Sequence, residues 1–194
     1  MPASQAVHGI MVGVVDSLAD DENLGRVRVR LPTYGDQITS EARLATPFGG
    51  KNRGLFCRPE VGDEVLIAFE HGDPRFPYVL GTLWSSDDPP PADDGKPEDN
   101  NWRQLHSRSG HILRFDDTDG GEKIELIDKD GKRRLVIDAA GAKIRIECDQ
   151  GDVEIKAGTK VRVEAPTIEL EASGNLTVQA GGELTLKGTK VNIN

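Results

Sequence analysis

From Gly141 to Asn194 the sequence contains no Phe, Tyr or Trp, and aromatic residues make up only 5% of the whole chain. An ordinary β-sandwich would be expected to place aromatic side chains in its core and to space its strands irregularly. The absence of aromatic residues therefore disfavours a sandwich for the C-terminal part of the chain.

Long apolar segments are absent as well. No apolar run reaches the length of about 18 residues that a transmembrane helix needs. The first residues, Met1 to Gly9, do not resemble a charged segment followed by an apolar export signal. We therefore expect the protein to be made and folded in the bacterial cytoplasm.

Cysteine is scarce, and the charge is predominantly of one sign. Cys57 and Cys148 lie far apart in different parts of the sequence, so we expect two independent buried thiols rather than a disulfide or a metal pair. The formal net charge of -9 disfavours long-range attraction to nucleic acid or to an anionic membrane.

The C-terminal region contains a repeat. Seven four-residue units alternate polar and apolar side chains, and their first apolar residues are Ile144, Val153, Val161, Ile168, Leu176, Leu184 and Val191. Their spacing of seven to nine residues gives a period near eight. Strict alternation is typical of short strands with one buried and one solvated face, and Gly or Pro residues between the units permit sharp corners. The repeat predicts a β-solenoid.

The length of the repeat predicts how many chains build it. A three-faced solenoid needs about 23 residues for each turn, so residues 141–194 make little more than two turns, fewer than a stable array requires. We therefore expect three chains to wind around one axis as an intertwined triple-stranded β-helix. The predicted trimer core comprises Ile144, Ile146, Val153, Ile155, Val161, Val163, Ile168, Leu170, Leu176, Val178, Leu184 and Leu186.

The N-terminal part is predicted to contain five short strands separated by turn signals. They are Ile10 to Val15, Arg26 to Leu31, Arg43 to Thr46, Glu64 to Glu70 and Tyr78 to Trp84. Five strands in about 80 residues fit a small OB-fold barrel. Arg26, Arg28 and Arg30 alternate along one strand and share a face. Acids are frequent in this module and aromatics are few in its strands, so this face suits a protein partner better than nucleic acid.

Four ordered segments of this module carry a family resemblance. They are Asn23-Leu24-Gly25-Arg26-Val27-Arg28-Val29-Arg30-Leu31-Pro32, Ala45-Thr46-Pro47-Phe48-Gly49-Gly50, the segment from Pro59 to Pro74, and Tyr78-Val79-Leu80-Gly81. They resemble the barrel domain of contractile-tail spike proteins, which include the phage baseplate assembly protein V group and the VgrG proteins of type VI secretion. The resemblance implies a trimeric central spike with its barrels at the hub end and its β-helix directed at the target cell.

The chain is predicted to consist of four parts. Residues 1–85 form the barrel, and residues 86–101 form an acidic, Pro-rich linker with an extended conformation. Residues 102–140 form a collar at the needle base, in which strands Lys123 to Asp128 and Arg133 to Asp138 are joined around Asp130-Gly131, a strong hairpin signal. Residues 141–194 form the needle. From Ser107 to Asp117 the collar also resembles the spike family, so the resemblance covers nearly the whole chain.

The predicted function is structural. The family resemblance implies a spike in the baseplate of a phage tail or phage-like particle, in contact with a hub protein at the barrel end and indirectly with the baseplate and inner tube. Arg26, Arg28 and Arg30 are the candidate hub contact. Val191, Ile193 and Asn194 are the candidate contact for a PAAR-repeat tip protein, because no His follows His111 and the His-x-His iron site of some phage spikes is missing. We expect no catalytic residue, metal, cofactor or nucleic-acid partner, and membrane contact only during puncture.

Two other functions remain open. The first is an OB-fold module that binds an oligosaccharide or a nucleic acid and is trimerised by the solenoid. The second is an envelope-degrading enzyme that uses Glu147, Glu154 and Glu164, since glycosidases act with paired carboxylates. Interleaved Lys and Arg residues make cross-strand charge pairing the better explanation of these acids. Ser107 and His111 lack the sequence context of a nucleophile elbow.

Overall fold

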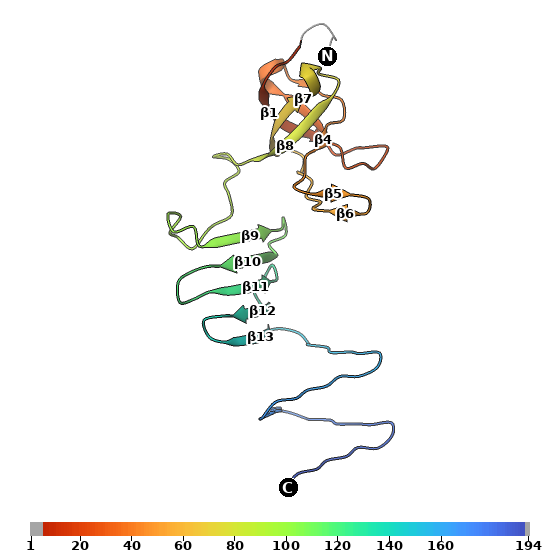
Figure 1. Cartoon of the computed structure of the whole chain (residues 1–194), viewed down its shortest axis with the longest axis vertical. Helices are drawn as coiled ribbons and strands as arrows, with labels where there is room; N and C mark the ends of the chain where they lie inside the picture. Colours follow the sequence, from red (N-terminus) through yellow and green to blue (C-terminus); the bar gives the residue numbers. More distant parts are fainter. Residues whose placement is uncertain (1–5, 193–194) are drawn as a thin grey trace.

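The computed structural model describes residues 6–192, in which all regular structure is β-strand apart from two 3-10 turns. Figure 1 shows three parts along the long axis: a curled sheet, a second sheet below it, and an extended segment beneath both. Residues 86–101 join the two sheets and contain neither strand nor helix. Over these residues the chain is all-β, as predicted.

The upper sheet curls into a half-barrel. Its strands are β1 (Ile10–Ser17), β2 (Arg28–Leu31), β3 (Gln37–Ile38), β4 (Arg43–Leu44), β7 (Glu64–Phe69) and β8 (Pro77–Leu83), and the 3-10 turns are η1 (Pro32–Tyr34) and η2 (Glu70–Gly72). The strand order is β3-β2-β1-β7-β8-β4, and every pair is antiparallel except the parallel pair β4 and β8. This arrangement is consistent with the predicted OB-type domain.

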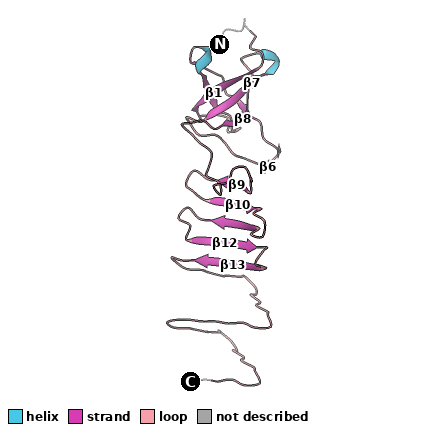
Figure 2. Cartoon of the chain, turned by 90° about the vertical axis from the view of Figure 1, so that its left-hand side faces the viewer, coloured by secondary structure: helices cyan, strands magenta, loops and turns pink. Residues whose placement is uncertain are grey.

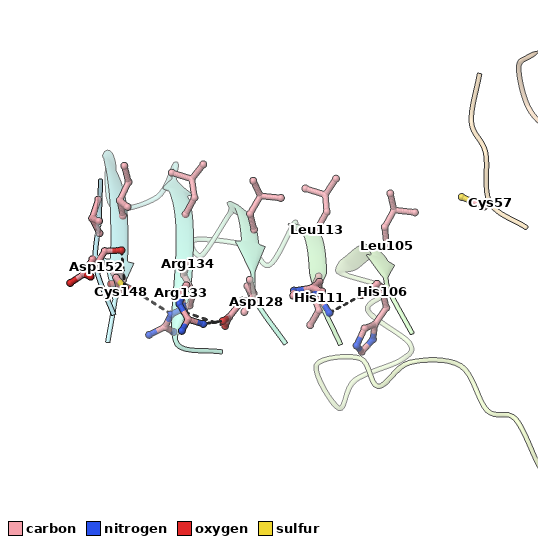
Figure 3. A pocket seen from close by; sticks show the side chains of 18 residues that line it. Cys57, Leu105, His106, His111, Leu113, Asp128, Arg133, Arg134, Cys148 and Asp152 are labelled. Carbon is pink, nitrogen blue, oxygen red and sulfur yellow. Dashed lines mark hydrogen bonds and ion pairs between the residues drawn. The ribbon is translucent and has the colours of Figure 1, made fainter. Parts of the chain in front are cut away.

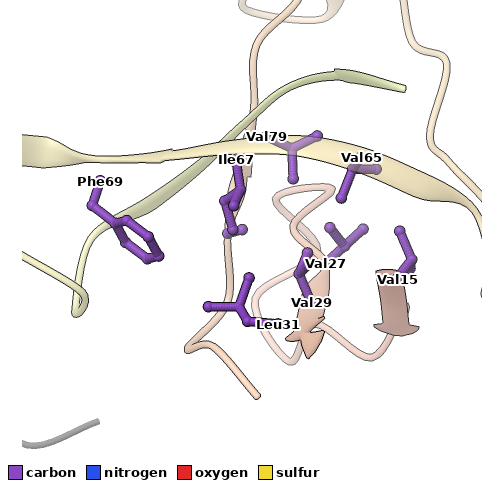
Figure 4. Packing of buried hydrophobic residues seen from close by; sticks show 9 residues of the cluster. Val15, Val27, Val29, Leu31, Val65, Ile67, Phe69 and Val79 are labelled. Atoms are coloured by element: carbon purple, nitrogen blue, oxygen red, sulfur yellow. The ribbon is translucent and has the colours of Figure 1, made fainter. Parts of the chain in front are cut away.

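The core of the half-barrel follows from alternation within its strands. Along β7, Val65, Ile67 and Phe69 point inward, whereas the residues between them are partly exposed. The buried cluster comprises Val15, Val27, Val29, Leu31, Ala42, Val65, Ile67, Phe69 and Val79 (Figure 4). Only one residue of this cluster is aromatic, so the core is packed mainly by branched aliphatic side chains.

The five strands predicted for this part are present, with shifted ends. β1 extends to Ser17, and β4 is only two residues long. β2 begins at Arg28 because Val27 pairs only with Ala42, in an isolated bridge. The prediction missed β3 and also the hairpin of β5 (Gly49–Gly50) and β6 (Arg53–Gly54). These strands have two residues each, too few to form a periodic pattern.

The lower sheet is an antiparallel meander of five strands. They are β9 (Trp102–His106), β10 (Ile112–Asp116), β11 (Lys123–Ile127), β12 (Arg133–Asp138) and β13 (Lys143–Cys148). The predicted hairpin around Asp130-Gly131 is confirmed, with Gly131 in the left-handed region at φ 69°. β13 contains the first unit predicted for the needle and pairs with β12, so collar and needle share one sheet.

Residues 151–192 are extended and run back and forth below β13 (Figures 1 and 2). No strand is assigned in this segment, and its side chains are exposed to solvent. A single chain therefore does not form the predicted β-helix, and the winding of three chains stays a prediction.

The two cysteines are free thiols. The prediction that both are buried is wrong for Cys57, which is exposed because residues 51–57 at the tip and returning side of the β5–β6 loop protrude from the half-barrel. Cys148 is partly buried at the end of β13, where its Sγ lies 3.3 Å from the Gln150 carbonyl oxygen. Within residues 6–192, no helix is long and apolar enough to cross a membrane.

The core assignment predicts a large effect at one position of the half-barrel. Ile67→Ala removes a fully buried side chain and should destabilise this domain by about 2–5 kcal/mol, lowering its Tm by roughly 10 °C or more. Leu80→Ala, on the adjacent strand β8 at a side chain that is 45% exposed, should cost less than about 1 kcal/mol. Differential scanning calorimetry of both variants measures the difference, and equal shifts would contradict the core assignment.

Candidate functional site

One face of the lower sheet carries a continuous apolar surface. Directly paired residues form a row across all five strands, and this row consists of Leu105, Leu113, Leu126, Leu135 and Ile146. A second row on the same face consists of Phe115, Ile124, Ile137 and Ile144. Paired residues and residues two apart in a strand share a face, so the nine side chains point the same way. Figure 3 shows Leu105 and Leu113 projecting together from their strands. We call these nine residues the apolar face.

The apolar face has little cover within its own chain. The side chains at its two ends, Leu105 and Ile146, are 58% and 67% exposed. An open cavity of about 780 Å³ at its edge is lined by this row together with Cys57 and Val153. Contiguous exposed apolar surface of this kind marks an interaction site in a soluble protein.

The opposite face of the sheet is charged and makes its contacts within the chain. The guanidinium of Arg114 stacks on the Trp102 ring at 3.7 Å and lies 3.5 Å from a Glu125 oxygen. Lys123 lies between Glu125 and Asp116, with its Nζ 3.5 Å and 3.8 Å from their oxygens. These charged groups pair with one another within the chain. The sheet therefore has one face whose charges are paired internally and one apolar face that is left open.

Asp116 illustrates how the charged face is held. Burial raises the pKa of its carboxyl, but hydrogen bonds from the hydroxyl and backbone N–H of Thr118, at 2.6 and 3.0 Å, outweigh that effect and leave the pKa below its usual value. The carboxylate is thus kept ionised beside Lys123.

The apolar pattern continues below the sheet, again without cover. Ile155, Leu170 and Leu186 are 74%, 74% and 68% exposed. All twelve residues predicted for the trimer core are exposed, and in one chain they are not brought together. Ile144 and Ile146 belong to the apolar face, which connects the predicted core with the lower sheet.

Sequence analysis missed the seven members of the apolar face that precede β13. They are Leu105, Leu113, Phe115, Ile124, Leu126, Leu135 and Ile137. A signal exists for Ile124 and Leu126, because Lys123-Ile124-Glu125-Leu126 has the same alternation as the needle units. The longer strands and turns of this region hide it, since they break the period near eight.

The three arginines predicted to face a hub each have a carboxylate partner in their own chain. Arg26 lies 2.6 Å from Asp20 and 2.7 Å from Glu41, and its side chain is only 18% exposed. Arg28 and Arg30 are more exposed, and they pair with Glu41 and Asp36 at 3.3 and 3.0 Å. Arg26 stabilises its own loop, while the hub contact stays a prediction.

A groove lies between the barrel wall and the loop that carries β5 and β6. It has a volume of about 1460 Å³, and its lining includes Phe48, Phe56 and Phe76. Arg43 lies over the Tyr78 ring at 5.5 Å. Aromatic and guanidinium groups together can stack on bases or sugars.

Comparison with known proteins identifies the upper domain. Residues 11–84 match the type VI secretion system/phage-baseplate injector OB domain family. The type VI secretion system spike protein VgrG5 of Pseudomonas aeruginosa is 27% identical over 138 residues, covering 67% of this chain and 16% of VgrG5. Residues 11–84 therefore form an OB domain of this family, and the chain is similar to VgrG-like and baseplate V spike proteins.

Two further relatives extend the match beyond the OB domain. The spike protein VgrG1a of P. aeruginosa is 22% identical over 230 residues, which cover 85% of this chain and 36% of VgrG1a. The actin cross-linking toxin VgrG1 of Vibrio cholerae is 27% identical over 204 residues, which cover 97% of this chain and 17% of the toxin. The chain thus spans between a sixth and about a third of the length of these relatives.

Two of the three acids considered for glycan cleavage form ion pairs, and the third, Glu154, forms none within residues 6–192. Glu147 lies 3.2 Å from Arg134 and 3.4 Å from Arg145, and Glu164 pairs with Arg162. His111 accepts a hydrogen bond from the Lys129 N–H through Nδ1 at 3.2 Å, so this nitrogen is not directed at Ser107. In the part of the chain that the structure describes, no three His, Cys, Asp or Glu side chains converge as metal ligands would.

Residues proposed for the spike tip fall partly outside the structure. Val191 is 53% exposed. Ile193 and Asn194 lie outside the described residues.

The Asp20–Arg26 pair predicts a pH dependence of barrel stability. The hydrogen bond from the Arg26 side chain, opposed by burial, holds the pKa of the Asp20 carboxyl well below its usual value. A depressed pKa stabilises the fold above the unfolded-state value of about 3.9, and this contribution is lost as the pH falls below that value. Asp20→Asn should therefore lower the Tm at neutral pH and flatten its decline below about pH 4.

Asp21→Asn is the matched control, because Asp21 is an exposed neighbour without an ion pair in the described chain. Its Tm profile from pH 2 to pH 7 should follow the parent. Identical acid limbs for the parent and Asp20→Asn would show that the pair does not govern this dependence.

Proposed function

We propose that this chain is a structural spike subunit of a contractile injection machine and that it works as a homotrimer. The apolar face carries the proposal, because it opens to water in one chain and is continued by the exposed apolar residues of the segment below. Relatives named as type VI secretion spike proteins support the same function. In our proposal three chains turn this surface toward a common axis, where it becomes the core of an intertwined β-helix.

The geometry of the lower half supports three chains rather than one. Burial of an apolar side chain stabilises a fold by about 1.5–3 kcal/mol relative to leaving it exposed. One chain leaves all twelve predicted core residues without that gain. It also leaves the backbone of residues 151–192 without ladder partners, and neighbouring chains would supply them. The apolar rows of β9–β13 extend the proposed core upward beyond the predicted boundary at residue 141.

The proposed role is mechanical, not enzymatic. A prism whose strands all pair with other chains has few free edges, so it can bear compression when a contracting sheath drives it into an envelope. The proposed parts are the barrel at 1–85, the linker at 86–101, the collar at 102–140 and the needle at 141–194. We place the hub at the barrel, where Arg28 and Arg30 are the more exposed of the three candidate arginines. A PAAR-type tip protein is proposed to cover Val191, which is 53% exposed.

A second candidate function is supported by the groove beside β4 and β8. Its aromatic lining and Arg43 suit an oligosaccharide or a single-stranded nucleic acid, which OB-type barrels bind. The net charge of -9 opposes the nucleic acid. If this groove binds a ligand, fluorescence titration with peptidoglycan fragments or a labelled oligonucleotide should saturate, and Phe56→Ala should weaken binding by about tenfold. Saturation that Phe56→Ala leaves unchanged would remove the groove from consideration.

The trimer is tested by one charge placed on the proposed axis. Leu176→Asp would bring three carboxylates together in an apolar core and should abolish the trimer. Thr177→Asp is the matched control, since alternation directs it to the solvated side. Analytical ultracentrifugation at micromolar concentration should give a trimer for the parent and the control, and smaller species for Leu176→Asp. A parent that sediments as a compact monomer would overturn the proposal.

A further inference from the structure

The loop of residues 45–57, which we call the arm, is basic and projects from the barrel. Its hairpin of β5 and β6 carries Lys51 and Arg53 at the tip, and both are exposed. No acidic residue occurs in the sequence between Glu41 and Glu60. Within residues 6–192, neither Lys51 nor Arg53 makes an ion pair. The arm therefore presents positive charge that its own chain leaves unneutralised.

The linker of residues 86–101 has the opposite character. It contains six acidic residues and one lysine; the acids are Asp87, Asp88, Asp93, Asp94, Glu98 and Asp99. None of these six carboxylates forms an ion pair within the described chain. The linker thus presents negative charge that no cationic side chain of the described chain neutralises.

Both segments are held in place before any partner arrives. The arm is closed at its base by the Thr46 hydroxyl, which donates to the Leu55 carbonyl at 2.7 Å, and Arg58 anchors its end to the Leu18 and Arg26 carbonyls. The linker is tied to β9 by Gln104, which donates to the Ala92 carbonyl at 3.0 Å, and it is held internally by Asn101, which donates to Asp94 at 3.1 Å. Preordered surfaces lose less entropy on binding.

Arm and linker lie on opposite sides of the chain. Figure 1 shows the arm on the right and the linker on the left, both between the half-barrel and the lower sheet. One chain therefore cannot pair them. In a ring of subunits related by rotation, however, the contact is between different surfaces, so one side of each subunit meets the other side of the next.

We propose that the basic arm of one subunit docks on the acidic linker of the next subunit around the threefold axis. This inference rests on the proposed homotrimer and adds a specific contact to it. The partner that binds the arm is a second copy of this chain. The basic arm and the acidic linker both lie between the half-barrel and the lower sheet, on opposite sides of the chain. The contact joins the barrel of one subunit to the lower sheet of its neighbour and sets the rotation of the barrels above the needle.

Lys51 allows a direct test, because it is the only lysine of the arm. A carbodiimide joins a lysine amine to a carboxylate that touches it, forming an amide without a spacer. Treatment of the full-length trimer should give covalent dimers and trimers in denaturing gels. In mixed trimers of ordinary and ¹⁵N-labelled chains, mass spectrometry should find the Lys51 peptide joined to a linker peptide of the other isotope. Lys51→Arg keeps the charge and removes the amine, so this cross-link should disappear.

A charge-reversal cycle tests the contact without cross-linking. Lys51→Glu with Arg53→Glu should speed subunit exchange, measured by fluorescence energy transfer between labelled trimers, by up to about tenfold at low salt. Asp93→Lys with Asp94→Lys should do the same, and combining all four changes should restore slow exchange. Restoration requires that the two surfaces meet, whereas loss of folding would affect the combined variant as well.

The outcomes separate this inference from the proposed function. A monomeric parent protein would overturn the homotrimer itself. A parent that sediments as a trimer but gives no Lys51 cross-link to a linker peptide of another chain would overturn the arm contact alone. Cross-links confined to peptides of the same isotope would also overturn it.

Discussion

The lower half of this protein depends on a sheet with one apolar and one charged face. Alternation along β9–β13 places a row of five aliphatic side chains on one face, from Leu105 to Ile146, and ionic groups such as Arg114 and Glu125 on the other. The ionic face pairs with itself and tolerates water. The apolar face is not covered within one chain, because the lower sheet does not curl back over its nine side chains. Burial of this face therefore requires another molecule, and the segment below repeats the same requirement to Val191.

The upper half shows what the lower half lacks. Its sheet curls, so strands β1, β2, β7 and β8 cover the same interior and bury Val29, Leu31 and Ile67 completely. In the lower sheet, Val136 is the one hydrophobic residue buried to this degree among residues 102–192. The chain thus combines a domain that buries its own hydrophobic core with a region whose alternating apolar side chains stay largely exposed. This division matches a spike in which one part attaches to other proteins and the other forms a shared shaft.

The strands could be predicted from sequence where they repeat a period or carry a turn signal. The alternation along β7 was sufficient to predict that strand, and the Asp130-Gly131 turn was sufficient to predict the hairpin of β11 and β12. The arm was missed because Gly49, Gly50 and Gly54 are three of the four residues in its short strands and provide no side-chain pattern. The membership of Leu105 and Leu113 in the apolar face could not be predicted, because it depends on register between strands, which one chain's periodicity does not specify. Exposure of Cys57 depends on the same missed arm.

In the proposed trimer, the orientation of each barrel above the needle is the remaining physical problem. Within residues 6–192, the ion pair between Arg108 and Glu60, 3.0 Å apart, is the one recorded between barrel and lower sheet, and its side chains are 81% and 49% exposed. Such surface pairs contribute little to stability. The linker contains neither strand nor helix, and Gln104 ties it to β9 and not to the barrel. A contact from each arm to the next subunit's linker would close a ring of three such links above the shaft. Force applied to one barrel would then pass to two lower sheets rather than one, so the load would be shared before it reaches the apolar core.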